Sequence, residues 1–115
     1  MLNDLRNAAH ANAEAHGFHK NWNFGMCLML IVCELSEALE ADRAGKWVDL
    51  KHLNDTPESV DYKAHIKGTV EEEIADAVIR LLDLAGCYDI DLDWHVKAKM
   101  EFNKSRPYMY GKSIR

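Results

Sequence analysis

Two long segments of this sequence carry apolar residues at helical spacing, and no segment alternates with the period of two that a half-buried strand requires. The first segment covers residues 26–44 and is followed by Gly45, which is well placed to end a helix. Its strongest apolar stripe consists of Leu28, Val32, Leu35 and Leu39. Met26, Leu30 and Cys33 make the opposite side apolar as well. The chain is therefore predicted to be all-α, with the first half of this helix buried on both sides.

The glycines and prolines divide the chain into four predicted helices, over residues 2–16, 26–44, 69–85 and 92–104. Thr69 is the predicted N-cap of the third helix, with Glu72 completing a capping box, and Gly86 is expected to end that helix. The expected apolar face of the third helix consists of Val70, Ile74, Ala77, Val78, Leu81 and Ala85. Residues 46–68 lack a sustained period and are expected to form a loop that contains at most one short helix.

The 115 residues suffice for one domain, 1–115, with a single modest core. Because helix 26–44 is apolar on two sides, one four-helix layer covers it poorly, and we expect a homodimer or homotetramer. The longest apolar run is shorter than a membrane span and lies inside the chain, and no signal segment is evident. These observations, together with three cysteines read as buried thiols, predict a cytoplasmic protein without a membrane partner.

The net charge of −5 is distributed unevenly. Residues 69–93 hold eight acidic and one basic side chain, whereas residues 94–115 hold six basic and one acidic side chain. An acidic segment directly followed by a basic one does not form the net basic face that duplex binding requires, so nucleic acid is not an expected partner. The two segments can instead hold a divalent cation and phosphate oxygens, respectively.

Two pairs of carboxylates stand out on the predicted helices: Glu34 with Glu37, and Glu73 with Asp76. Residues three apart on a helix point to the same side, so each pair can grip one cation. Hard oxygen ligands favour Mg²⁺, with Mn²⁺ as a substitute, over zinc. No glutamate is followed by histidine three residues later, which argues against a di-iron bundle.

The basic C-terminal segment places Lys99, Asn103 and Arg106 on one helical face. An ammonium, an amide and a guanidinium together are suited to binding phosphate oxygens. A solvated cationic helix end is the alternative interpretation.

These motifs resemble those of the MazG-like all-α nucleoside triphosphate pyrophosphohydrolases. The resemblance covers residues 18–112 and rests on an E-x-x-E motif, an E-x-x-D motif and a K-x-x-x-N-x-x-R motif in that order. It implies a four-helix MazG-like bundle completed by oligomerisation. The stretch between Glu37 and Glu73 is longer than the usual spacer of compact members of that family.

The resemblance also implies an enzyme that uses Mg²⁺ to split nucleoside triphosphates into monophosphate and pyrophosphate, a chemistry suited to removing non-canonical nucleotides. Glu34, Glu37, Glu73 and Asp76 match the metal ligands, and Lys99, Asn103 and Arg106 match the phosphate-binding tail. Glu37 or Glu34 is the expected base that orients the attacking water.

Base recognition requires aromatic faces and polar edges. The segment just before helix 26–44 supplies both kinds of group, in Phe18, His19, Asn21, Trp22 and Phe24. Of these, His19, Trp22 and Phe24 are the predicted base-binding residues, although core packing explains the two aromatic rings equally well. The alternative functions are a related phosphoribosyl-ATP or dUTP pyrophosphatase and a non-catalytic helical module that binds a metal or a partner.

Overall fold

The computed structural model describes residues 1–49 and 55–111, and the side chains within these ranges except those of 110 and 111. The helices are α1 (Leu2–Ala15), α2 (Phe24–Arg43), α3 (Tyr62–His65), α4 (Val70–Cys87), α5 (Leu92–Lys104) and the 3₁₀ helix η2 (Tyr108–Gly111). No strand occurs in the described part of the chain, so the all-α prediction is confirmed. The short α3 lies in the predicted 46–68 loop, of which residues 50–54 are outside the described ranges.

Helix α2 begins two residues earlier than predicted because the Asn23 side chain accepts a hydrogen bond from the Met26 N–H. Its C-terminal end agrees with the prediction. Gly45 has a positive φ of 69°, and the Lys46 N–H donates to the Ala41 carbonyl at 2.8 Å. This arrangement is a Schellman motif, in which glycine adopts the left-handed conformation at no steric cost.

Helix α4 begins at the predicted cap, where Thr69 Oγ1 accepts a hydrogen bond from the Glu72 N–H at 3.2 Å. The Glu72 carboxylate reaches back to the N–H of Gly68, one residue before the N-cap. The prediction that Gly86 ends the helix was wrong. The helix continues to Cys87, and Asp89, with φ 51°, takes the left-handed position beyond its end.

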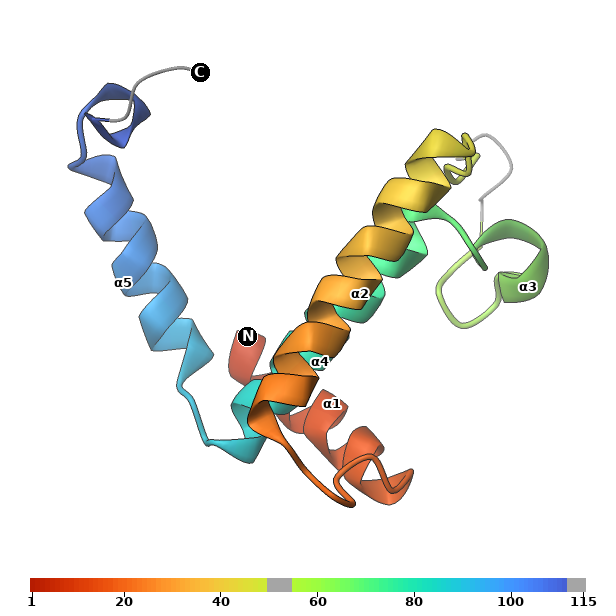
Figure 1. The fold of residues 1–115 in the computed structure, drawn as a ribbon, viewed down its shortest axis with the longest axis horizontal. Coiled ribbons are helices and arrows are strands. Elements are labelled where there is room, and N and C mark those ends of the chain that lie inside the picture. Colours follow the sequence, from red (N-terminus) through yellow and green to blue (C-terminus); the bar gives the residue numbers. More distant parts are fainter. Residues whose placement is uncertain (50–54, 112–115) are drawn as a thin grey trace.

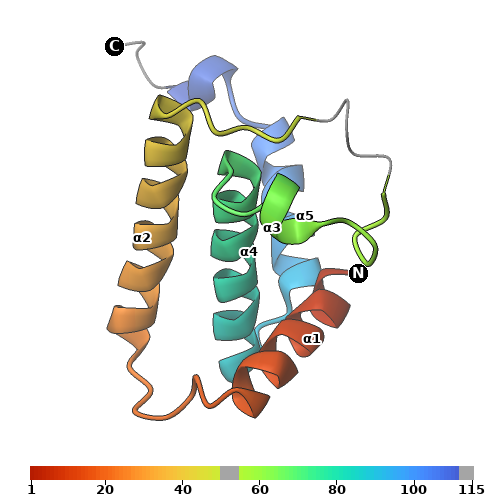
Figure 2. The same cartoon turned by 90° about the vertical axis from the view of Figure 1, so that its right-hand side faces the viewer.

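Helices α2 and α4 run side by side in opposite directions, and α1 crosses the C-terminal end of α4 (Figure 2). The core between them is small and contains no fully buried large side chain among the described residues. Its centre is formed by Ile31, Ala77 and Leu84, with Trp22 and Cys27 packed against it. Four of the eight buried apolar residues are alanines, namely Ala13, Ala41, Ala77 and Ala85.

The side of α2 that faces α4 differs from the predicted stripe. Ile31 and Ala41 are buried, whereas Leu28, Val32, Leu35 and Leu39 are between 39% and 52% exposed.

On α4 the predicted apolar face is buried at three positions and exposed at the other three. Val70, Ala77 and Ala85 are buried, but Ile74, Val78 and Leu81 are each about half exposed. Both helices thus present a second apolar face outside the intrachain core.

Helix α5 diverges from the α2–α4 pair, so that the chain is shaped like an open V (Figure 1). Its base is held to α1 by reciprocal capping of two helix N-termini. Asp93 accepts a hydrogen bond from the Leu2 N–H at 2.7 Å, and Asn3 Oδ1 accepts one from the Leu92 N–H at 2.9 Å. A four-helix bundle is therefore not closed within one chain.

The cysteines were expected to be buried thiols, and this was wrong for Cys33, which is exposed on α2. Cys27 and Cys87 are partly buried, and all three are free thiols. Among the described residues, no helix has the length and apolar character needed to cross a membrane.

Candidate functional site

Three of the four predicted metal ligands meet between α2 and α4. One carboxylate oxygen from each of Glu34, Glu73 and Asp76 lies within 4.8 Å of the other two. Packing explains the meeting, because Ile31 is buried against α4 and Glu34 follows it by three residues on the same side of α2. On α4, Glu73 follows the buried Val70 by the same interval.

Glu37 lies one turn beyond Glu34 and is exposed. Its carboxylate is nevertheless close enough to Glu73 to raise the pKa of that group through a shared hydrogen bond and through its charge. Both members of the predicted pair are thus neighbours of Glu73. Glu34 belongs to the inner group of three carboxylates, and Glu37 stands at the solvent side of Glu73.

Burial and like charges raise the pKa values of both α4 carboxyls. The pKa of Glu73 rises to about 7, first because of burial and then because of the neighbouring Glu37 and Glu34. The pKa of Asp76 is also raised, first by burial and then by the charge of Glu34. Glu73 Oε2 is buried and has no hydrogen-bond partner. A carboxylate set with an unsatisfied buried oxygen and excess negative charge is suited to a hard divalent cation such as Mg²⁺.

Arg80 is a residue of this site that sequence reasoning missed. Its Nε donates a hydrogen bond to Glu34 Oε1 at 3.0 Å, and the Glu34 side chain is largely buried. The guanidinium therefore holds Glu34 in place and offsets part of the negative charge. The signal in the sequence was that Arg80 is the one basic residue of an otherwise acidic helix, four residues after Asp76.

A cavity of about 340 Å³ extends from this site toward the link between α1 and α2. Glu34, Asp76 and Arg80 line one part of it, and Phe18 and Trp22 line another. Its volume is at the lower end of the range for small-molecule sites. The cavity thus joins acidic side chains, a cation and two aromatic rings.

The three predicted base-binding residues have different surroundings. Trp22 lines the cavity and donates a hydrogen bond from Nε1 to the Tyr88 hydroxyl at 2.8 Å. Phe24 packs edge-on against Tyr88, with ring centroids 5.2 Å apart, and is not among the lining residues. Both nitrogen atoms of His19 are engaged, one with Glu14 and one with Asp83. Phe18, whose ring is 71% exposed, is therefore better placed for stacking than Phe24 or His19.

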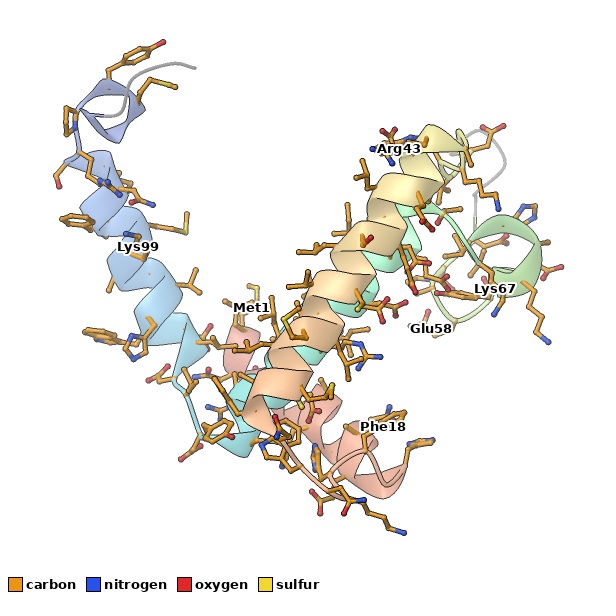
Figure 3. All side chains as sticks on the ribbon, viewed as in Figure 1. Met1, Phe18, Arg43, Glu58, Lys67 and Lys99 are labelled. Carbon is orange, nitrogen blue, oxygen red and sulfur yellow. The ribbon has the colours of Figure 1, made fainter. Side chains whose placement is uncertain are left out.

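Lys99 and Arg106 both lie over the ring of Phe102, at 5.0 Å and 5.5 Å from its centroid. The expectation of one shared helical face was wrong for Arg106, which lies two residues beyond the end of α5 at Lys104. Asn103 is partly buried, and its Oδ1 has no hydrogen-bond partner. Lys99 lies on the arm of the V opposite α2 (Figure 3). One chain therefore does not bring its basic set to its own carboxylates.

No protein-family model, curated protein or solved structure matches this chain.

Proposed function

We propose that this protein is a Mg²⁺-dependent pyrophosphohydrolase that cleaves nucleoside triphosphates to monophosphates and pyrophosphate. The observation that carries the proposal is the group of Glu34, Glu73 and Asp76, whose oxygens lie within 4.8 Å of one another beside a cavity lined by aromatic rings. Carboxylates suit the cation, and the rings suit the base. The cavity connects the carboxylates, which would face the phosphates of a nucleotide, with the aromatic rings, which would face its base.

The residues fit Mg²⁺ because all donors are oxygens and Glu73 Oε2 is buried without a partner. Glu34, Glu73 and Asp76 would hold the ion, with Glu37 at their solvent side. When bound, Mg²⁺ neutralises negative charge on the phosphates and on the carboxylates.

The positions of the two candidate bases favour Glu37. Glu34 accepts the hydrogen bond from Arg80, which fixes its orientation and occupies one of its carboxylate oxygens. Glu37 is exposed beside Glu73 and can reach a water at the edge of the site. In the proposed step, Glu37 takes the proton from the attacking water, the water oxygen bonds to phosphorus, and pyrophosphate leaves.

The open shape of the chain supports an oligomer. The radius of gyration is 17.0 Å, whereas a compact domain of this length has about 13 Å. The accessible surface is 9057 Å², against about 6,400 Å² for a compact monomer of this mass. A second copy that covers the Leu28–Leu39 stripe would bury this excess surface.

The same second copy explains the separation of the basic set from the carboxylates. In a symmetric pair, Lys99, Asn103 and Arg106 of each chain lie against the carboxylates of the other chain, where they bind the phosphates. The four-helix bundle is then completed between copies, as a homodimer or as a homotetramer built from such dimers.

The activity is tested with a panel of canonical and modified nucleoside triphosphates, including dUTP, and phosphoribosyl-ATP, with detection of pyrophosphate. We expect pyrophosphate release that requires Mg²⁺ or Mn²⁺ and is abolished in Glu37→Gln and Asp76→Asn. Glu40→Gln changes an exposed acid of the same helix and should retain activity. Orthophosphate as the first product, or full activity in EDTA, would contradict the proposal. Mg²⁺ binding without hydrolysis of any substrate would identify a non-catalytic module instead.

The arrangement across two chains is tested by mixing inactive variants. Asp76→Asn disables the carboxylates, and Arg106→Ala disables the tail. A dimer of either variant alone therefore has no intact site. After the two are unfolded and refolded together in equal amounts, half of the dimers are mixed, and each mixed dimer has one intact site. We expect recovery of about a quarter of wild-type activity from this statistical assembly. No recovery, or a monomer by sedimentation at micromolar concentration, would show that the tail does not act across chains.

A further inference from the structure

A second group of metal-ligating side chains lies where α1 crosses α4, and one of its members, Asp83, also lines the cavity that Glu34 and Asp76 line. The group consists of His10 from α1, His19 from the α1–α2 link, and Asp83 and Cys87, which are one turn apart on α4. One ligand atom of each residue lies within 4.8 Å of those of the other three. No step of the proposed hydrolysis uses His10 or Cys87, so the group requires another explanation.

The spacing of these atoms matches the edges of a zinc tetrahedron. Asp83 Oδ1 lies 3.2 Å from His10 Nδ1 and 2.8 Å from His19 Nε2. Cys87 Sγ lies 3.7 Å from the same nitrogen of His10 and 3.6 Å from the same nitrogen of His19. Ordinary zinc bond lengths in a tetrahedron give about 3.3 Å between nitrogen and oxygen and about 3.6 Å between nitrogen and sulfur. Shifts of a few tenths of an ångström would therefore suffice to admit the ion.

The surroundings of the two imidazoles also match a metal site. Glu14 Oε2 lies 2.5 Å from His19 Nδ1 and 4.0 Å from His10 Nε2, the nitrogens that point away from the cluster. A carboxylate on the far nitrogen of a ligating histidine orients the ring and makes it a stronger ligand. The His19 and Asp83 side chains are each 15% exposed and the His10 side chain is 33% exposed, so the cluster is partly buried and accessible to an ion.

The backbone allows α1 to approach α4 closely at this point. A Cβ added to Gly86 would lie 2.6 Å from His10 Cβ, so any larger residue would displace the histidine. The cluster thus ties α1, the α1–α2 link and α4 together in a chain whose core consists mainly of short side chains. A bound ion at such a junction stabilises the fold directly.

We propose that His10, His19, Asp83 and Cys87 bind one structural Zn²⁺ ion. Four protein ligands fill the tetrahedron and leave no open position, as is typical of structural rather than catalytic zinc. Without the ion, Glu14 and Asp83 favour a proton on His19 instead, and the experiment separates these two states. The proposal is independent of the hydrolytic activity.

The test uses the full chain stripped of metal and titrated with Zn²⁺, and with Co²⁺ as a spectroscopic probe. We expect one ion per chain, intense visible bands typical of four-coordinate Co²⁺, and a thiolate-to-cobalt charge-transfer band. Cys87→Ser should remove the charge-transfer band, whereas Cys27→Ser and Cys33→Ser, which alter the other two thiols, should keep it. Zn²⁺ should also raise the melting temperature of the wild-type protein and of Cys33→Ser.

Glu14→Ala provides a second test that does not depend on the folding of a ligand variant, because Glu14 contacts the histidines but is not itself a proposed ligand. We expect it to weaken Zn²⁺ binding by about 10- to 100-fold. Asp76→Asn, at the other site, should leave Zn²⁺ affinity unchanged. A charge-transfer band that survives in Cys87→Ser, that disappears in Cys33→Ser, or that never forms in the wild type would overturn the assignment. Unchanged Zn²⁺ affinity in Glu14→Ala would overturn it as well.

Discussion

Glu73→Gln tests whether the carboxylates between α2 and α4 repel one another when no cation is present. The pKa of Glu73 is raised from 4.5 to about 7 in the folded protein, so the folded state holds this proton more tightly than the unfolded chain. The free energy of unfolding therefore falls as the pH rises from about 4.5 to about 7, and this contribution is constant at higher pH. The full shift corresponds to about 3 kcal/mol, which water screening at a partly exposed site reduces to about 1–2 kcal/mol.

The glutamine amide is neutral at every pH and can donate a hydrogen bond to Glu37 or Glu34, so the variant escapes this loss. In EDTA at pH 8, we expect Glu73→Gln to be more stable than the wild type by about 1–2 kcal/mol, or about 4–10 °C in melting temperature. At pH 4.5 the two proteins should differ little, because Glu73 is then protonated in the folded protein and about half protonated in the unfolded chain, so that most of the charge repulsion is absent.

The measurement is urea unfolding of both proteins at the two pH values, with Glu40→Gln as the matched control. Glu40 is an exposed acid on α2, and its variant should stay within about 0.5 kcal/mol of wild type at both pH values. Destabilisation by Glu73→Gln at pH 8, or a difference that does not change with pH, would refute the repulsion argument.

Three further perturbations test other contacts. Gly86→Ala should lower the free energy of unfolding by about 1–3 kcal/mol, because the new Cβ would lie 2.6 Å from His10 Cβ; an unchanged urea midpoint would contradict the close approach. Asp93→Ala removes the acceptor of the Leu2 N–H and should cost about 0.5–2 kcal/mol, with faster hydrogen exchange in the first turn of α1; unaltered exchange would show that the cap is dispensable. Asp76→Asn should melt in EDTA at or above the wild-type temperature and respond less to Mg²⁺, and an undiminished Mg²⁺ shift would remove Asp76 from the metal site.

The ends of several helices could be predicted from the sequence because caps are local interactions. Thr69 needs only the N–H three residues ahead to begin α4, and Gly45 needs only a left-handed φ to end α2. Lys99 and Arg106 were predicted on one helical face, and both contact Phe102, but Arg106 does so from beyond the end of α5.

Features that depend on a second element could not be predicted in this way. Gly86 reads as a helix end, yet it lies inside α4, where His10 of α1 occupies the space that a side chain at this position would need. His10, His19, Asp83 and Cys87 follow no recognisable metal-ligand spacing, and only the crossing of α1 and α4 brings them together.

The sequence by itself determined that the chain is helical, where most helices begin, and which carboxylates share a side of α2 or α4. Only the tertiary structure decided which apolar side of α2 meets α4, and it selected Ile31 and Ala41 over the stronger stripe of Leu28 and Leu39. The physical reason is that periodicity defines a face without specifying what covers it. The face that packs inside the chain is the one that also brings Glu34 of α2 to Glu73 and Asp76 of α4.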